Sequence, residues 1–494
     1  MIANPPRVFL AALSLAGAGA VLLATLRYGA GLSPDAVGYI GVARQLLAGN
    51  GVSGYEGQPF VIQPPLYPVL LALAGWLAGA DPLHLAPLLN ALLCGVAVFL
   101  TAQLCARHRQ LYPSLASFGP ALSLLSWPFF AVGVMAWSEP LFITLGLAAL
   151  LSLGRYLDEE RLGWLVAAGV AVALACLTRY IGLAFLLAGG VLVCWRSARP
   201  LAQRLAHLVC FGAIAGLPLV GWLARNHQLT GTWLGPRQAS AHTLAENLGL
   251  TCAGLAGLWV PEVLGIPRLL RLGLAGAVAL ALLAAALWLA RRWRTTGAGL
   301  ALVAGWGGAY VLFLIFTSTT TAYDDINLRL LSPFYPCGAV LVLALAGRVE
   351  QGGWPRAARA GLVVLLALSL AGIAVAGAGY LDQGAGAGTG PDRYNTAPWR
   401  QSETIQYLRQ HPAPGALYSN APDALYILGG LSATLSPRRA GEAAWPPAGR
   451  LVWLDAVRRQ YLRDPAELRA RHRVRLLARF ADGALYEFLP VEKE

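Results

Sequence analysis

Charge is scarce in this chain, because only 12% of its 494 residues are Asp, Glu, Lys or Arg. A soluble globular protein typically carries about 25% charged residues, so about half of the usual charge is missing. The deficit extends from Met1 to about Tyr380, and charge becomes ordinary after Asp382. This asymmetry excludes a single soluble domain and divides the chain into two parts, residues 1–380 and 381–494.

Lysine is almost absent, with Lys493 as its single representative, and arginine carries nearly all of the formal net charge of +13. In a soluble protein this balance would suggest a nucleic-acid partner. Here the arginines stand between apolar runs, where membrane topology and anionic lipid explain them. We therefore expect a lipid bilayer as the surroundings and no nucleic acid.

Patterned cysteines and nucleotide-binding motifs are also missing. The seven cysteines show neither metal-ligand spacing nor a disulfide framework. No Walker sequence or glycine-rich phosphate loop occurs. The sequence thus supports neither a cofactor nor a metal site, and we predict none.

The chain has instead a series of apolar segments that approach the length of a membrane crossing, about 20 residues. We predict about eleven spans, which are residues 8–27, 84–106, 114–134, 139–155, 162–178, 180–195, 203–224, 271–290, 298–316, 331–347 and 358–380. Stretch 66–80 is too short and is predicted to be an interfacial helix. The fold class is mainly α, a polytopic transmembrane helical bundle.

The first apolar segment contains Ala18-Gly19-Ala20, which would suit cleavage of a signal peptide. The apolar run continues past this site, however, and further spans follow. We therefore expect a retained first helix.

Arginine placement predicts the orientation of the spans. With the N-terminus in the cytoplasm, the arginines of five loops fall on the cytoplasmic side, as the positive-inside rule requires. They are Arg107 and Arg109; Arg155 and Arg161; Arg196, Arg199 and Arg204; Arg291, Arg292 and Arg294; and Arg348, Arg356 and Arg359. An odd number of crossings then leaves the C-terminal part outside a multi-pass protein of the cytoplasmic membrane.

The part after residue 380 is predicted to be a linker and a small extracytoplasmic α/β domain. Gly384 to Gly390 is the linker, and residues 400–411 and 422–428 are helices. Buried strands are expected at Ala416–Ser419 and Leu451–Leu454. Asp482-Gly483 is typical of a hairpin turn between Leu476–Phe480 and Ala484–Phe488.

Ionisable and polar residues at the outer ends of the spans are candidates for function, because such residues are costly near a membrane. Asp35 could accept a proton from a hydroxyl that attacks a sugar. Alternatively it caps a helix, since Pro34-Asp35 precedes a helical pattern that includes Tyr39. The two interpretations do not exclude each other.

Glu139 is either part of a binding site or a first-turn acid that the helix dipole favours. Arg179 and Arg225 could bind phosphate through their planar donors, or could extend toward lipid headgroups. Both arginines lie on the outer side of the membrane, where the positive-inside rule makes arginine uncommon. This placement favours the interpretation that they bind an anion. Arg329 is a third candidate for binding phosphate. Asp324 and Asp325 either balance its charge or are solvated loop residues. Two adjacent acids are only a weak signal for a metal site.

Several of these segments resemble the GT-C membrane glycosyltransferases. The first loop resembles theirs in Asp35 and Tyr39 before Ala-Arg-Gln-Leu-Leu-Ala-Gly-Asn-Gly, and then in Gln63-Pro64-Pro65-Leu66-Tyr67-Pro68. Later landmarks follow in the same order, at Ser138 to Phe142, Thr178 to Leu183, and Arg329 to Pro336. The branch that the chain resembles contains protein mannosyltransferases and lipid A aminoarabinose transferases.

The resemblance implies an inverting transfer of one sugar from a polyprenyl-phosphate donor, at the outer membrane face, to a lipid, glycan or protein acceptor. Asp35 matches the catalytic carboxylate and would be the general base. Arg179, Arg225 and Arg329 would bind the donor phosphate, with Tyr39, Tyr67 and Glu139 shaping the site. The chain departs from the family in two ways. Asp35 is followed by Ala36, where many members carry a second acid. The lysine that some relatives use near the donor phosphate has no counterpart in this chain.

Metal dependence varies across the superfamily, and the sequence gives a divalent metal no support. Two alternatives stay open: an oligosaccharide polymerase or ligase with a lipid-diphosphate donor, and a secondary transporter. A transporter would predict charges near the membrane midplane and matching halves, neither of which the chain shows.

Overall fold

The computed structural model describes residues 6–488 apart from 197–198, 323, 353–354, 389–393, 413–414, 440–448, 471–473 and most of 262–297. The chain divides into two compact units. The first comprises Met1–Leu26, Val61–Tyr67 and Pro87–Gln383, and the second Arg27–Phe60, Pro68–Ala86 and Gly384–Glu494. The second unit therefore combines the C-terminal part with two segments of the long first loop.

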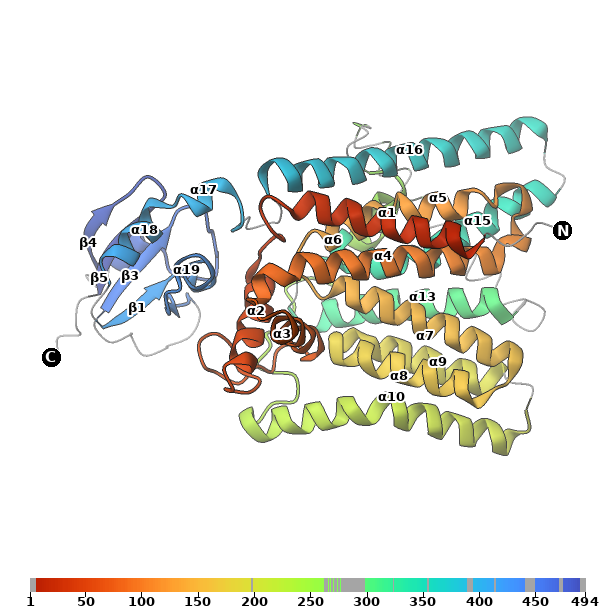
Figure 1. Cartoon of the computed structure of the whole chain (residues 1–494), viewed down its shortest axis with the longest axis horizontal. Coiled ribbons are helices and arrows are strands. Elements are labelled where there is room, and N and C mark those ends of the chain that lie inside the picture. Colours follow the sequence, from red (N-terminus) through yellow and green to blue (C-terminus); the bar gives the residue numbers. More distant parts are fainter. Residues whose placement is uncertain are drawn as a thin grey trace. The chain divides into compact units, whose positions relative to one another are not determined.

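The first unit is a bundle in which long apolar helices run side by side (Figure 1). The long helices are α1 (Arg7–Thr25), α4 (Pro82–His108), α7 (Glu139–Glu159), α8 (Leu162–Thr178), α9 (Leu183–Arg196), α10 (Leu201–Thr230), α11 (Leu244–Trp259), α13 (Ala298–Thr320), α15 (Tyr335–Gln351) and α16 (Arg356–Ala387). Short helices connect them: η1 (Arg109–Leu111), η2 (Pro113–Leu115), α5 (Phe118–Leu124), α6 (Trp127–Gly133), η3 (Tyr180–Gly182), α14 (Leu328–Leu331) and η5 (Ser332–Phe334).

Glycines allow close packing between three of these helices. A Cβ atom at Gly189 of α9 would lie 2.6 Å from the Phe211 ring of α10, and one at Gly169 of α8 would lie 3.0 Å from Ile214. Small residues at such contacts let helix backbones approach in a membrane, where association depends on van der Waals packing.

Within the described residues, seven helical segments are long and apolar enough to cross a membrane, so the expected number of eleven spans is not confirmed. Expected span 114–134 is interrupted between α5 and α6, where Pro128 begins a new helix. Expected spans 162–178 and 180–195 form shorter apolar helices. Expected span 271–290 falls mostly outside the described residues.

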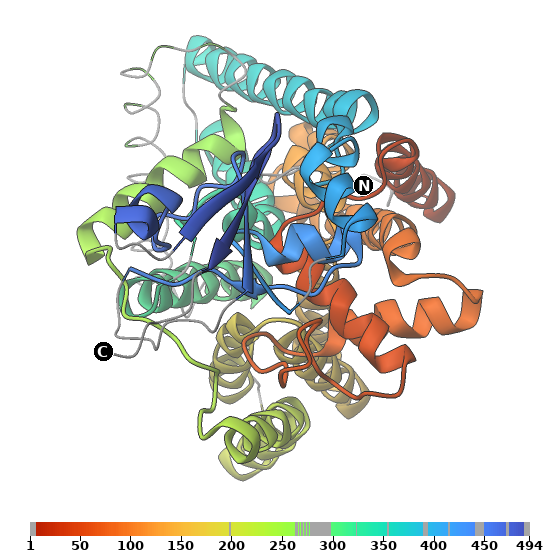
Figure 2. The same cartoon turned by 90° about the vertical axis from the view of Figure 1, so that its left-hand side faces the viewer.

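The second unit contains one mixed sheet, whose strands lie side by side in Figure 2. The strands are β1 (Ala416–Ser419), β2 (Thr434–Leu435), β3 (Gly449–Leu454), β4 (Val474–Arg479) and β5 (Gly483–Phe488), in the order β2-β1-β3-β5-β4. Strand β1 runs parallel to β2 and β3, and β5 runs antiparallel to β3 and β4. The expected strands and hairpin are confirmed, whereas the two-residue β2 was not predicted.

In the described part of the second unit, six helices accompany the sheet: α2 (Pro34–Leu47), most of α3 (Leu66–Ala78), α17 (Ala397–Arg400), α18 (Glu403–Gln410), α19 (Pro422–Gly429) and α20 (Pro465–Ala470). Helix α3 is the short helix expected at 66–80. The expected linker is corrected in part, because Gly384 to Ala387 form the last turn of α16. Gly388 ends that helix at φ +81°, a conformation that glycine adopts without strain.

Candidate active site

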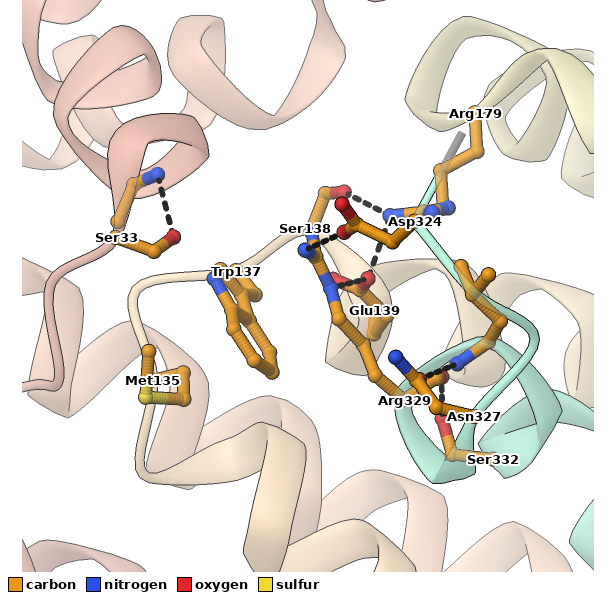
Figure 3. A network of polar contacts seen from close by, with 12 residues as sticks. Ser33, Met135, Trp137, Ser138, Glu139, Arg179, Asp324, Asn327, Arg329 and Ser332 are labelled. Carbon is orange, nitrogen blue, oxygen red and sulfur yellow. Dashed lines mark hydrogen bonds and ion pairs between the residues drawn. The ribbon is translucent and has the colours of Figure 1, made fainter. Parts of the chain in front are cut away.

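A buried carboxylate binds two arginines in the first unit (Figure 3). The Glu139 side chain is 1% exposed, and its Oε1 accepts hydrogen bonds from Arg179 Nη1 at 2.7 Å and from Arg329 Nε at 2.5 Å. Arg179 also donates to Ser138 Oγ at 3.2 Å. The structure thus brings together three of the residues selected from the sequence, Glu139, Arg179 and Arg329.

Local sequence places each of these side chains at the end of a helix. Glu139 begins α7, where Pro140 suits the first turn because it needs no hydrogen-bond partner for its nitrogen. Arg179 follows α8 in an extended conformation that ends the helix. Arg329 lies in α14, which Asn327 caps by accepting a hydrogen bond from Leu330 N at 3.3 Å.

This cluster places two partly buried arginines around one buried carboxylate. The Arg179 and Arg329 side chains are 19% and 12% exposed, and they share the single charge of Glu139. Asp324 contacts Arg329 at 3.5 Å but is 68% exposed, where an ion pair contributes little. Among the described residues, Glu139 Oε2 is buried without a hydrogen-bond partner. Two guanidinium groups held side by side in this way suit an anion.

Trp137 fixes the plane of one arginine. The Arg329 guanidinium carbon lies 4.0 Å from the centroid of the Trp137 ring, a cation–π contact. A stacked guanidinium keeps its donors in one plane, the geometry that suits a phosphate or carboxylate.

A second network adjoins the first through the Arg179-Tyr180 peptide. The Tyr180 hydroxyl donates to Val61 O at 3.0 Å and accepts from Trp222 Nε1 at 3.0 Å and Asn226 Nδ2 at 3.2 Å. Half-buried Arg225 donates to Asn226 Oδ1 at 3.1 Å, and its guanidinium carbon is 4.5 Å from the Trp222 ring centroid. The third predicted arginine therefore belongs to a network that adjoins the first.

Tyr67 supports the segment that precedes Glu139. Its hydroxyl, fully buried, donates to Asn90 Oδ1 at 3.0 Å. The Asn90 amide donates in turn to Met135 O and, at 3.2 Å, to Trp137 O. Asn90 was not selected from the sequence, although a polar side chain inside the expected span 84–106 was a usable signal.

Arg237 is a second residue that the sequence analysis missed. It donates to Ile62 O at 2.7 Å, and its guanidinium carbon lies 5.8 Å from the Tyr180 ring centroid. The two acids considered for a metal have other contacts, since Asp324 contacts Arg329 and Asp325 contacts His242 Nε2 at 2.9 Å.

Asp35 and Tyr39 lie on α2 in the second unit. The helix cap is Ser33, whose hydroxyl accepts from Ala36 N at 3.4 Å, so the interpretation of Asp35 as the cap is wrong. Asp35 is a half-buried acid of the first turn, and Tyr39, one turn later, is 1% exposed. Asp35 is therefore more accessible than Ala36 and Val37, which follow it directly on α2.

The chain is similar to known membrane glycosyltransferases in part of its sequence and in most of its fold. Residues 62–222 match the family model described as dolichyl-phosphate-mannose-protein mannosyltransferase. The crystal structure of ArnT from Cupriavidus metallidurans in the apo state gives a TM-score of 0.60 at 16% identity, covering 96% of this chain and 97% of that chain. This chain therefore has a fold of the GT-C class, like that of ArnT.

The resemblance to the GT-C glycosyltransferases is thereby confirmed. The structure of ArnT from the same organism bound to undecaprenyl phosphate has the same GT-C fold, with a TM-score of 0.58 at 14% identity over 96% of this chain and 97% of that chain. Among curated proteins, no sequence matches the chain.

Proposed function

We propose that the chain is an inverting glycosyltransferase, which moves a single sugar from a polyprenyl-phosphate donor to an acceptor at the outer face of the cytoplasmic membrane. The observation that carries this proposal is the pair of partly buried arginines that share one oxygen of Glu139. Their planar donors suit a lipid phosphate at the edge of the bilayer.

Two comparisons support a lipid monophosphate as the carrier. The matching family model is named for a dolichyl-phosphate sugar, and ArnT has been crystallised with undecaprenyl phosphate. The acceptor is a lipid, a glycan or a protein. The transfer requires no cofactor in this proposal.

The reaction replaces one bond to the anomeric carbon with another. An acceptor hydroxyl oxygen attacks that carbon while the bond from the carbon to the phosphate oxygen breaks, which inverts the anomeric configuration. Asp35 takes the proton of the hydroxyl as general base. The lipid phosphate leaves with the electron pair, so negative charge develops on it.

Arg179, Arg225 and Arg329 stabilise that developing charge, which is often the largest contribution to catalysis in such sites. Glu139 holds two of these arginines in place, and Tyr67 supports the same segment through Asn90. Tyr39 also shapes the site in this proposal. Burial strengthens the contacts of the arginines with phosphate because solvent screens them less.

The topology is proposed on the positive-inside rule. The N-terminus lies in the cytoplasm, and the C-terminal part lies outside with the candidate site. Fusing an alkaline phosphatase to the C-terminus tests this orientation, since that enzyme is active only outside the cytoplasm. An inactive fusion, combined with an active cytoplasmic reporter at the same position, would contradict it.

Transfer by the purified protein from a panel of polyprenyl-phosphate sugars tests the function, with Asp35→Asn compared with Asp455→Asn. Asp455 is a matched control because it forms a surface pair with Arg479. We expect Asp35→Asn to lose at least 100-fold in kcat, in the range of general base catalysis, and the control to match wild type.

Unchanged turnover in Asp35→Asn would remove the general base from the mechanism. Activity only with diphosphate donors would favour a polymerase or ligase instead. Uptake of a solute into vesicles without transfer would favour a transporter.

A further inference from the structure

Helix α2 packs against the C-terminal part of the chain within the second unit. Tyr55 lies between them: a Cβ atom at Gly41 of α2 would come 2.9 Å from Tyr55 Cβ, and the Tyr55 ring stacks on Tyr426 of α19 at 4.7 Å between centroids. Only a glycine at position 41 permits this approach. Burial raises the pKa of Tyr55, so its ring stays an uncharged phenol in the stack.

Arg44 adds a polar contact to the same interface. Its guanidinium carbon lies 5.4 Å from the Tyr426 ring centroid, and its Nε and Nη2 donate to Asp81 at 2.9 and 3.2 Å. One face of α2 is therefore held at Gly41 and Arg44, one and two turns after the first turn that carries Asp35.

The chain that enters α2 is also bound to the C-terminal part. Arg400 Nη2 donates to Tyr28 O at 2.7 Å, and Asn395 Nδ2 donates to Gly29 O at 3.3 Å. Asp35 thus lies between two points of attachment, one before α2 and one along it.

Helix α19 is itself fixed firmly enough to serve as a support. The buried carboxylate of Asp423 accepts from Arg459 Nη2 at 2.8 and 2.9 Å and from the Tyr394 hydroxyl at 2.9 Å. Asn420, just before α19, donates to Leu454 O at the end of β3 at 2.8 Å. The support for α2 is therefore tied to the sheet of the same unit.

We propose that the C-terminal part positions α2 for sugar transfer, with Tyr426 as the positioning residue that acts through Asp35. This inference rests on the proposed function, in which Asp35 is the base. The donor phosphate is bound by arginines of the first unit, so loss of the Tyr426 contact slows transfer without weakening donor binding. A misplacement of about 1 Å can cost about 100-fold in rate.

Tyr426→Ala, Tyr426→Phe and the control Tyr461→Ala test this role in the full-length protein. Tyr461 is a half-exposed tyrosine of the same part of the chain, and its ring faces Arg438. We expect Tyr426→Ala to lower kcat about tenfold or more and to keep the Kd for undecaprenyl phosphate within about twofold. Tyr426→Phe, which keeps the stack, and Tyr461→Ala are expected to match wild type.

Hydrogen exchange supplies a readout that does not depend on turnover. Exchange of the backbone amides of 36–47 should accelerate in Tyr426→Ala, because an element opens more often when its packing is lost. If Tyr426→Ala does not fold, Tyr55→Leu removes the same stack from the other side.

Wild-type kcat and wild-type exchange in Tyr426→Ala would overturn the inference. An increase in the KM for the acceptor alone, with kcat retained, would also overturn it and assign the C-terminal part to acceptor recognition. If the wild type transferred sugar from no polyprenyl-phosphate donor, the proposed function would fail, whereas an inactive Asp35→Asn beside a normal Tyr426→Ala would reject only the positioning role.

Discussion

Each unit of the chain contains a buried carboxylate bound by arginine, and the two differ in how the charge is balanced. In the second unit, Asp423 pairs with one arginine, and both of its oxygens accept hydrogen bonds. In the first unit, Glu139 faces two arginines, which share one of its oxygens. The first arrangement pairs one arginine with one carboxylate, whereas the second gathers two arginines on a single carboxylate oxygen, with the exposed Asp324 as a further partner of Arg329.

The difference teaches how a structural ion pair can be told from a binding site. Burying a balanced pair contributes mainly to the stability of its surroundings, and removal of one partner leaves a costly charge behind. Two guanidinium groups held on one carboxylate oxygen instead present donors of the kind that bind anions. Their place where α7 begins and α8 ends therefore points to binding.

Substituting one arginine in each cluster should distinguish ligand binding from structural stabilisation most clearly. We expect Arg329→Gln to weaken binding of undecaprenyl phosphate about 100-fold, or about 2.8 kcal/mol, with little change in thermal unfolding because Arg179 still balances Glu139. Arg459→Gln should instead destabilise the second unit by about 3–5 kcal/mol and leave that binding unchanged. Titration with undecaprenyl phosphate and thermal unfolding of both variants measure these effects. Weaker binding in Arg459→Gln together with a large loss of stability in Arg329→Gln would contradict the comparison.

Glu139→Gln is expected to have an intermediate effect. The amide oxygen can still accept a hydrogen bond from one arginine, but the two guanidinium groups lose the charge that aligns them. We expect kcat to fall about tenfold, a typical contribution of a group that only orients others, while phosphate affinity is kept or increased. A loss of affinity as large as that of Arg329→Gln would show that Glu139 contacts the ligand itself.

The smallest effect is expected at Asp482, a carboxylate that neutral donors satisfy. Burial raises its pKa, but hydrogen bonds from Ser402 and from the Thr404 hydroxyl and amide outweigh burial, so the pKa lies below the usual range. A lowered pKa in the folded state stabilises the protein above the unfolded pKa of about 3.9, and this stability is lost as the pH falls through the folded value.

Thermal unfolding between about pH 5 and pH 2, on either side of the usual pKa of Asp, measures this contribution. We expect Asp482→Asn to lose stability at pH 5 and to approach wild type in the most acidic samples. An equal difference at every pH would mean that the charge of Asp482 is not involved.

Local patterns predicted the elements of the second unit well. The strand at Ala416–Ser419 and the hairpin at Asp482-Gly483 appear as expected, because their signals are contained in a few neighbouring residues. The two-residue β2 has no such signal. In the first unit, hydropathy did not predict the break in span 114–134, although Pro128 was a usable indication.

The site was predictable only as a group of candidates at the same membrane level. That Arg329 and Glu139, 190 positions apart, share a hydrogen bond depends on how the helices pack. The cap at Ser33 in place of Asp35 depends on where α2 begins, and helix boundaries are the least certain part of any sequence-based prediction.

The attachment of Tyr28 and Gly29 to the C-terminal part also has a consequence for biosynthesis. Their partners Arg400 and Asn395 follow 372 and 366 positions later, so the ribosome needs roughly 20 to 70 s to produce them after the first loop. Throughout that interval α2 lacks its contacts with the C-terminal part. The second unit can therefore be assembled only after residues 395–400 have been synthesised, although two of its segments come from the first loop.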